Sequence, residues 1–485
     1  MATLITNDQY MSILPEIILS VAGMLVMVVD PLIPATRSRK PIGLLALVGS
    51  VLALAATAYQ LNSPNVTAFF GMVRVDYFSI FFHAVVICIS IAVILSSLDY
   101  LDTEGIRAGE YYGLILLGTV GMALMSSALE LVLIFIALEI SSISTYILAG
   151  FRRKVAASSE SAIKYFLLGS FATAFFLYGV ALIFGSTGTT NVSGIAQVLK
   201  SGNISLLTYM ALALMFVGMG FKVAGAPFHV WTPDVYEGAP IPVVAFMSTG
   251  PKAAAFAVML RILFGSFNDI GYWWIPLVWF SAALSMTLGN IGALLQNNVK
   301  RMLAYSSIAH AGYLLVAFAA GKELGIAAAI FYTASYAAMN VGAFAVVSHF
   351  SARGERYVNI DDYAGLGRRS PVLAATLTIF MLSLIGIPLT GGFFAKFYVF
   401  SAALQSNLVW LTIIGLVNSA VGAYYYLRLV VVMYMQEGDD SMPLIPVTKY
   451  FAAALILTAG ATIYLGVLPG HILGLATRGA HDLLR

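Results

Sequence analysis

The chain has 485 residues, of which 60% are hydrophobic and only 10% are charged, and its mean hydropathy is +0.92. Soluble domains carry about 25% charged residues, so this composition excludes a water-soluble enzyme or binding domain. Apolar runs of about twenty residues recur along the whole length, and each could cross a bilayer as a helix. The net charge of +3 gives no indication of nucleic-acid binding. The sequence therefore predicts an all-α polytopic membrane protein.

About fourteen spans are predicted, and no hydrophilic segment longer than about twenty residues separates them, so residues 1–485 are read as one integral membrane domain. The first span has no basic segment before it and is interpreted as retained, not as a cleaved signal. The single cysteine, Cys88, lies in an apolar run, which excludes a disulfide framework or a thiolate metal site. The predicted spans are 11–33, 41–61, 77–98, 111–128, 130–149, 160–185, 205–229, 240–264, 271–295, 301–320, 325–350, 372–404, 408–435 and 449–470.

Basic residues in the loops predict the orientation, because Lys and Arg accumulate in cytoplasmic loops. The loops on one side hold Arg37, Arg39, Lys40, Arg107, Arg152, Arg153, Lys154, Lys300, Arg301, Arg353, Arg356, Arg368, Arg369 and Lys449. The loops on the other side, together with both termini, hold Arg74, Lys200, Arg261, Lys322, Arg478 and Arg485. The richer side is predicted to be cytoplasmic, with both termini outside.

A few charged residues lie inside the predicted spans: Glu139, Lys164, Lys222, Lys252, Lys396 and Arg428. An isolated charge at the bilayer centre costs at least about 2.5–3.5 kcal/mol, so these groups must pair, lose their charge or meet water. One interpretation is structural: a Glu–Lys pair locks helices together, and Lys164 and Arg428, near span ends, snorkel to the surface. The other is a proton relay, which suits lysine because its proton affinity follows burial and neighbouring carboxylates. Arginine stays protonated and could not relay.

Two predicted spans contain helix-breaking residues beside a lysine. In "GFKVAGAPFHVW" Pro227 follows Lys222, and in "IGIPLTGGFFAKF" Pro388 and two glycines precede Lys396. The backbone groups freed at membrane depth need protein or water as partners, and a water-lined gap beside Lys222 would supply them.

The broken spans are the seventh and the twelfth, and five spans between them reverse the chain direction. This spacing predicts two inverted five-helix repeats, spans 4–8 and 9–13, with sites near the midplane. The chain then divides into three N-terminal spans (1–110), a first repeat (111–264), a second repeat (271–435), and a C-terminal span and tail (449–485).

Further polar residues lie along the same spans. Lys252 and His310 fall near span centres, and a histidine can both give and accept a proton near neutral pH, although a buried histidine is often simply hydrogen-bonded. His229, just after the first break, can be read either way. Asp234 and Glu237 are predicted to cap the helix that follows, with proton guidance as the alternative.

Solvated or capping roles suffice for Glu16 and Asp30 at the ends of the first span. The sequence has no P-loop and no dinucleotide-binding glycine motif, so the chain is predicted to move ions with energy supplied elsewhere.

Two long segments carry a family resemblance. "FKVAGAPFHVWTPDVYEGAPIPVVAFMSTGPKAAAF" and "NVKRMLAYSSIAHAGYLL" resemble the proton-translocating membrane subunits of respiratory complex I and their Mrp-type antiporter relatives. The form "PFHVWTPDVYEGAP" is similar to the N-type subunits of bacterial NADH-quinone oxidoreductase, whereas the L and M types and the antiporters typically read H-x-W-L-P-D-A-x-x-x-A-P. "SAIKYFLLGS" and "TGGFFAKFYVF" also match the N type, and the resemblance covers essentially the whole chain.

This resemblance implies a proton relay coupled to quinone reduction in other subunits. Glu139 would be the fifth-span carboxylate with Lys222 as its partner, and Lys164 would modulate that pair. Lys252 would be the central relay, His310 would join the two half-channels, and Lys396 would occupy the twelfth-span position.

The resemblance also implies surroundings. The chain would bind no cofactor, because FMN, iron–sulfur clusters and quinone belong to other subunits. Its neighbours would be K- and M-type subunits in a bacterial inner (plasma) membrane, with both termini periplasmic and lipid around the spans. The alternatives are a subunit of an Mrp-type cation/proton antiporter or membrane-bound hydrogenase, and a scaffold that conducts nothing.

Overall fold

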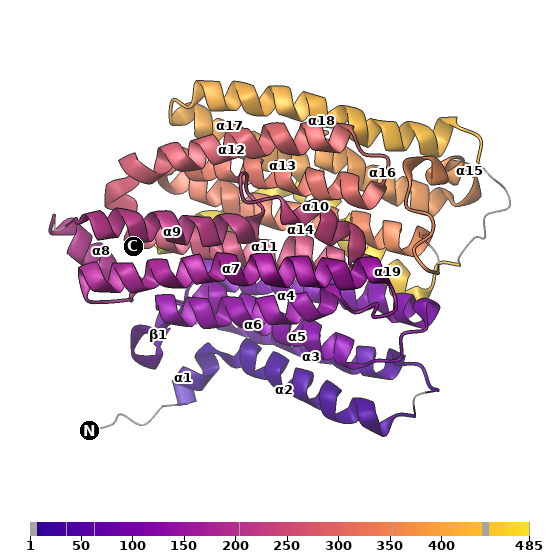
Figure 1. Cartoon of the computed structure of the whole chain (residues 1–485), viewed down its shortest axis with the longest axis horizontal. Helices are drawn as coiled ribbons and strands as arrows, with labels where there is room; N and C mark the ends of the chain where they lie inside the picture. Colours follow the sequence, from indigo (N-terminus) through magenta and orange to yellow (C-terminus); the bar gives the residue numbers. More distant parts are fainter. Residues whose placement is uncertain are drawn as a thin grey trace.

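The structure is a computed structural model that describes residues 7–34, 36–62, 64–202, 204–351, 353–438 and 446–484. Long helices lie side by side along one common direction (Figure 1). In the described residues the strands form one short antiparallel hairpin, β1 (Val66–Ala68) with β2 (Val73–Val75). The predicted all-α polytopic membrane architecture is confirmed.

Twelve helical segments of the described chain are long and apolar enough to cross a membrane. Their helices are α2 (Leu14–Val29), α3 (Lys40–Gln60), α4 (Tyr77–Glu104), α6 (Leu131–Ala149), α7 (Ala156–Thr187), α9 (Leu206–Val223), α11 (Ile241–Leu260), α12 (Gly271–Leu294), α13 (Val299–Ala320), α14 (Lys322–Phe350), α18 (Val409–Met435) and α19 (Lys449–Val467). The two remaining predicted spans are α5 (Glu110–Ser127) and the broken pair α16 (Pro371–Ile385) and α17 (Gly391–Gln405). Each predicted span therefore corresponds to a helix or a broken helix.

The short elements connect these helices or lie at their ends. They are α1 (Asn7–Ser12), η1 (Asp30–Leu32), η2 (Phe69–Gly71), α8 (Val192–Lys200), α10 (Trp231–Gly238), η3 (Arg261–Ser266), η4 (Asn268–Ile270), η5 (Ile360–Tyr363), α15 (Leu366–Arg369) and α20 (Pro469–Leu484). The sequence did not predict α8 or the β1–β2 hairpin, and it described the residues of α20 only as a tail.

Both predicted helix breaks are confirmed. Helix α9 ends at Val223, and α10 begins only at Trp231, while α16 ends at Ile385 and α17 begins at Gly391. At the first break the Ala226 N–H donates to Ser285 Oγ (2.7 Å), and Ser281 Oγ donates to the Ala226 carbonyl (2.6 Å). Serines of α12 therefore supply the protein partners that the Ala226 backbone needs at membrane depth, while the predicted water-lined gap beside Lys222 stays a prediction.

Corresponding helices of the two predicted repeats pack in corresponding ways. In the first, α5 packs on α6 and α7 packs on both α9 and α10; in the second, α12 packs on α13 and α14 packs on both α16 and α17. Helix α11 lies at the centre of the bundle, where its membrane-spanning window is completely buried, and apart from Lys252 its buried residues are mainly apolar or small. Helices α2 and α18 lie at opposite edges of the view in Figure 1.

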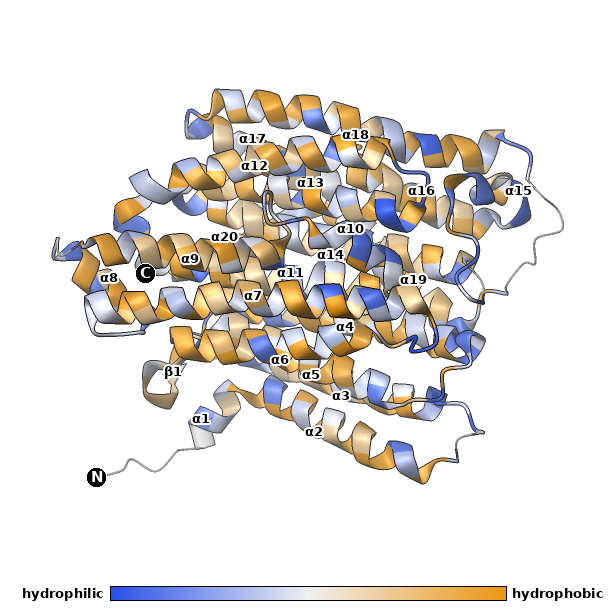
Figure 2. Cartoon of the chain, viewed as in Figure 1, coloured by the Kyte–Doolittle hydropathy of each residue, from blue (hydrophilic) through white to orange (hydrophobic). Residues whose placement is uncertain are grey.

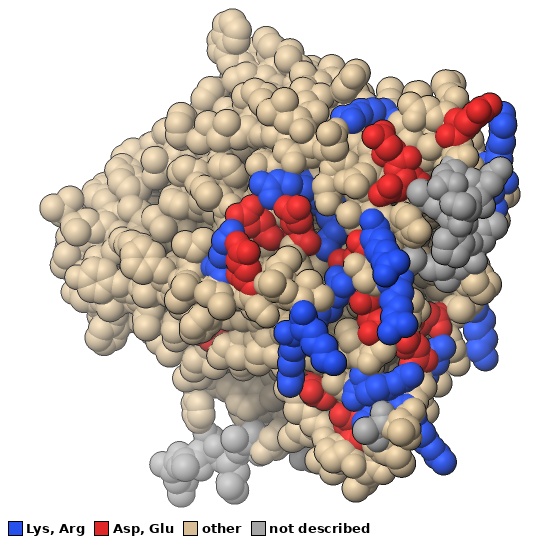
Figure 3. Space-filling view, turned by 45° about the vertical axis from the view of Figure 1, so that its right-hand side comes forward, with Lys and Arg blue, Asp and Glu red and all other residues tan. Residues whose placement is uncertain are grey.

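Charged side chains gather at one end of the bundle. The membrane-spanning helices are mainly apolar (Figure 2), and Figure 3 shows Lys, Arg, Asp and Glu clustered at the end drawn on the right in Figure 1. Ion pairs there include Arg39–Asp30, Lys40–Asp99, Arg107–Asp102, Arg152–Glu104 and Lys300–Glu355. Helices α1 and α20, next to the two termini, lie toward the opposite end, and Arg485 lies outside the described residues. This separation agrees with the prediction that one side of the bundle carries the loops rich in Lys and Arg and the other side carries the two termini.

Several residues expected at loop or solvent positions are buried. Arg261, counted among the outer loop residues, donates to both carboxylate oxygens of Asp76 (2.8 and 3.0 Å) and to the Ser126 carbonyl (2.6 Å). Asp76 also caps α4 by accepting from the Ser79 N–H (2.7 Å). Both members of the pair are almost fully buried, so the pair joins the start of α4 to the ends of α5 and α11.

The predicted solvated or capping role of Glu16 was wrong. Its side chain is only 3% exposed, and it lies 3.4 Å from His83 Nε2.

Candidate functional site

Lys222 lies in the last turn of α9, just before the break. Its Nζ donates to Ser142 Oγ (2.7 Å) and to the Tyr146 hydroxyl (3.1 Å), both on α6. The ammonium also lies over the rings of Tyr146 (5.1 Å), Tyr165 (5.9 Å) and Phe221 (5.8 Å). Aromatic faces attract a cation. Lys222 is only 6% exposed, so these three rings hold its amine away from bulk solvent.

Glu139 lies on α6, one turn before Ser142. Among the described residues it forms no ion pair within 4.0 Å, and its Oε1 is buried without a hydrogen-bond partner. The structure therefore places Ser142, not the carboxylate, in direct contact with Lys222. The predicted partnership with Glu139 is not a direct bond in this arrangement.

Lys252 lies in the middle of α11 and is 3% exposed. Its Nζ donates to the Ser307 carbonyl (2.8 Å) and to Ser307 Oγ, both on α13. No acidic side chain of the described chain lies within 4.0 Å of this amine. A buried amine with only neutral partners is stabilised by hydrogen bonds alone, which leaves its charge uncompensated.

His310 lies one turn after Ser307 on α13 and is 2% exposed. Its Nδ1 is 2.7 Å from the Tyr332 hydroxyl of α14, and its Nε2 is 3.2 Å from the Tyr426 hydroxyl of α18. Tyr426 is also hydrogen-bonded to Ser306. Both ring nitrogens therefore contact groups that can donate or accept, so the imidazole can pass a proton in either direction.

Lys396 lies near the start of α17 and fixes the second break. Its Nζ donates to the Leu384 and Ile385 carbonyls (3.0 and 2.8 Å) at the end of α16, and to Ser419 Oγ of α18 (2.9 Å). The amine also lies 4.8 Å from the centre of the Tyr313 ring. A cation stabilises the carbonyl end of a helix, so this lysine replaces the missing helical hydrogen bonds.

One face of α13 connects the last three groups. Ser307, His310 and Tyr313 follow one another at three-residue spacing, which places them on one side of a helix. Ser307 contacts Lys252, and Tyr313 contacts Lys396, while the rings of His310 and Tyr313 are 5.6 Å apart. The structure thus joins Lys252, His310 and Lys396, three residues far apart in sequence.

Lys164 does not lie with Lys252, His310 and Lys396. Its side chain is 41% exposed and forms ion pairs with Glu160 (2.8 Å) and Asp234 (2.9 Å). Asp234 and Glu237 bind Arg301 (3.0 and 2.6 Å), and neither supplies a side-chain cap to α11, so the predicted capping role was wrong. Lys164 and Arg301 hold the pKa of the Asp234 carboxyl below its usual range.

Sequence reasoning noted Ser306 and Ser307 one turn before His310, but it missed the hydroxyl groups beside Lys222 and the tyrosines that contact His310. Ser142 and Tyr146 follow Glu139 at three and seven residues, so helical spacing could have placed them on one face. Tyr332 and Tyr426 gave no such local signal, because they reach His310 from two other helices.

Glu355, also missed, lies in the loop after α14 and connects four parts of the charged end. It accepts from the Tyr100 hydroxyl (2.7 Å), the Ile241 N–H (2.8 Å) and Lys300 Nζ (2.8 Å), and Arg152 lies 3.0 Å away. Burial opposes ionisation of Glu355, but Lys300 and Arg152 outweigh it and hold the pKa of this carboxyl below its ordinary value. Glu355 thereby fixes the starts of α11 and α13, which carry Lys252 and His310.

The Glu355→Gln variant is expected to lose about 1–3 kcal/mol of stability, because two buried cations lose their carboxylate. A carboxyl with a lowered pKa stabilises the fold above its unfolded value of about 4.3 and loses that effect only as the pH falls through the folded pKa. The loss should therefore be constant between about pH 6 and 8. Thermal stability of the detergent-solubilised protein across this range measures it, and a loss that varies strongly with pH would contradict this assignment.

Comparisons with known proteins identify the family. Residues 128–422 match the family described as NADH:quinone oxidoreductase/Mrp antiporter, transmembrane. NADH-quinone oxidoreductase subunit N 2 of Koribacter versatilis is 64% identical over 99% of both chains. The chain belongs to the subunit N family of NADH-quinone oxidoreductase.

Solved structures agree with this membership of the subunit N family. A chain of respiratory complex I from Thermus thermophilus with bound aureothin is 36% identical, covers 96% of this chain and 99% of its own, and superposes with a TM-score of 0.81. A chain of the Mrp complex from Dietzia is 20% identical with a TM-score of 0.87, covering 99% and 98%, and shows the shared fold alone. In the subunit N chain itself, no group of three or more His, Cys, Asp or Glu side chains among the described residues could hold a metal ion.

Proposed function

We propose that the chain is the N-type subunit in the membrane arm of a proton-pumping NADH-quinone oxidoreductase and that it moves protons itself. The observation that carries this proposal is the row of buried amines on α9, α11 and α17, two of them joined by the Ser307–His310–Tyr313 face of α13. Relatives of 64%, 53% and 47% identity carry the name NADH-quinone oxidoreductase subunit N.

The proposed transfer begins at Lys222. A change in the charge or position of Glu139 alters the stability of the Lys222 cation, which then releases its proton. Water carries that proton to Lys252. Buried polar atoms without a protein partner, Glu139 Oε1 and Thr232 Oγ1, support a hydrated region around α6 and α10.

The proton then follows α13. Lys252 passes it to Ser307, and the hydroxyl and imidazole groups around His310 carry it toward Lys396 and the opposite side. Moving one elementary charge against 100 mV costs about 2.3 kcal/mol, so quinone reduction in other subunits must supply that work.

The surroundings follow from the same proposal. The other subunits of the complex, with K and M types as the neighbours, carry FMN, iron–sulfur clusters and quinone, and this chain carries no cofactor. The chain lies in a bacterial inner membrane with its charged end cytoplasmic and both termini periplasmic. The two inverted repeats correspond to residues 111–264 and 271–435, and Lys164 acts on the Glu139–Lys222 pair from the rim of the site.

The Lys222→Arg variant tests the relay. Arginine keeps the charge and the aromatic contacts, but it does not release a proton, so pumping through this chain should fall while NADH oxidation in uncoupled membranes continues. The measurement is the number of protons moved per NADH in inverted membrane vesicles. Unchanged pumping would refute the role of Lys222. The antiporter alternative instead requires Na⁺/H⁺ exchange by vesicles without NADH.

A further inference from the structure

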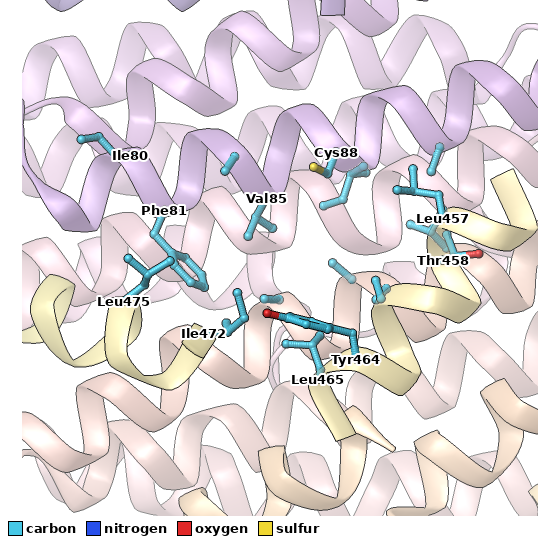
Figure 4. A pocket seen from close by; sticks show the side chains of 18 of the residues that line it. Ile80, Phe81, Val85, Cys88, Leu457, Thr458, Tyr464, Leu465, Ile472 and Leu475 are labelled. Atoms are coloured by element: carbon cyan, nitrogen blue, oxygen red, sulfur yellow. The ribbon is translucent and has the colours of Figure 1, made fainter. Parts of the chain in front are cut away.

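An apolar groove lies on another side of the bundle, between α4, α14, α19 and α20. Its cavity volume is about 320 Å³ (Figure 4). Small side chains create it: Ala84, Cys88 and Ala92 follow one another at four-residue spacing on α4, and Ala334 and Ala338 do so on α14. Residues at this spacing share one face of a helix, so two faces of small residues oppose each other along the groove.

The groove is suited to hydrocarbon and not to water. Its lining is almost wholly apolar, and apolar cavities of this kind stay dry. Empty space costs the lining residues their dispersion contacts, so a filled groove is favoured. The groove is open at α19, where Leu457 and Tyr464 are 39% and 41% exposed. Because the helices around it span the bilayer, lipid chains are the apolar molecules that reach this opening.

A cation lies at the α20 end of the groove. The guanidinium of Arg478 is 5.6 Å from the centre of the Tyr77 ring, and Tyr77 lines the groove. Among the described residues no acidic group lies within 4.0 Å of Arg478. The nearby acid on α20, Asp482, is buried and accepts from the Tyr77 N–H (3.0 Å). The exposed guanidinium is therefore available to a phosphate.

The same end carries further polar groups at the level of headgroups. The Tyr464 hydroxyl is hydrogen-bonded to His471 Nδ1 (2.9 Å), and Figure 4 shows the Tyr464 ring lying along the groove with its hydroxyl toward Ile472. Ile472 and Leu475 of α20 face the cavity. Helix α20 thus presents apolar side chains to the groove and polar ones to the surface, as an interfacial helix does.

We propose that this groove is a binding site for one phospholipid of the leaflet at the α20 end. One acyl chain lies against the small residues of α4 and α14, and the phosphate binds Arg478. The lipid would complete the packing on the side of α14 opposite the side on which Tyr332 contacts His310.

The test uses the assembled complex in native-like membranes that contain phosphatidylglycerol with a photoreactive diazirine in its acyl chain. Labelled peptides are expected from α4, α14 and α19. The Ala338→Leu variant fills the groove, and labelling there should fall about tenfold, equivalent to about 1.4 kcal/mol of binding. Arg478→Gln should lower labelling at the same peptides several-fold, roughly the contribution of a charge-assisted contact.

Matched controls distinguish a site from general lipid contact. Ala174→Leu places the same added volume on an exposed position of α7, and Lys200→Gln removes an exposed cation of α8; both should leave labelling of the groove unchanged. Equal labelling in Ala338→Leu and wild type would overturn the proposal. So would a photoreactive residue at position 338 that crosslinks to another protein subunit, because a protein would then occupy the groove.

Discussion

In the Lys252→Met variant, proton transfer through this chain is expected to fall about 10²-fold or more, the usual effect of removing a proton-transfer group. Lys252 is the residue of α11 that contacts Ser307, so its loss separates Lys222 from the His310 side. Methionine is similar in length to lysine and carries no charge. Replacing Lys252 by methionine therefore removes an uncompensated cation from a helix that is fully buried. Assembly should therefore survive, and the loss should appear as fewer protons moved per NADH in inverted vesicles.

Lys322→Met is the matched control, because Lys322 is an exposed lysine at the start of α14. It should pump normally. The scaffold interpretation makes the opposite prediction for Lys252, namely full pumping once assembly is intact. Normal proton yield from Lys252→Met in an assembled complex would therefore exclude the relay and leave the scaffold as the better account.

The Asp76→Ala variant is expected to lose about 3–5 kcal/mol of stability, because it leaves the Arg261 guanidinium buried without a counter-charge. Asp76 also caps α4, so helix initiation weakens at the same time. The expected result is a low amount of the chain in membranes and a lower melting temperature of the solubilised complex. Relay activity per assembled complex should change little, since no relay group contacts this pair.

The double variant Asp76→Ala with Arg261→Met isolates the charge effect. Removing both charges leaves no buried ion, so this variant should be more stable than Asp76→Ala alone. Asp269→Ala, at an exposed acid near the start of α12, should have no measurable effect. A double variant as unstable as the single one would show that the cap, not the ion pair, accounts for the loss.

The sequence predicts this fold well because a bilayer restricts the choices. Each span needs a long apolar run, and each break needs Pro or Gly, so both features are local and readable. Helix α20 was missed because its apolar residues are interrupted at helical spacing and never form a long run. Arg261 was assigned to a loop because the buried Asp76 that pairs with it is 185 positions away in the chain.

The site was predictable only in part, for the same reason. Charged residues inside spans are conspicuous, so the lysines and His310 could be selected from the sequence. Their partners are hydroxyl groups that any membrane helix contains, and only the folded bundle shows that Tyr332 and Tyr426 meet at His310 and that Ser307 meets Lys252. Spacing along one helix indicates which residues share a face, but it does not indicate which helix lies opposite. The sequence therefore predicted Glu139 as the partner of Lys222, whereas Ser142 makes the contact.

The contacts of Lys396 have a mechanical consequence. As an ammonium it has three N–H groups, and it uses them on three acceptors: two carbonyls of the interrupted helix α16 and one serine of α18. A neutral amine has only two N–H groups, so each departing proton must release one of these acceptors. In the proposed relay, Lys396 would therefore also hold α16 and α18 together, and each proton that passed would break and then restore one of these hydrogen bonds.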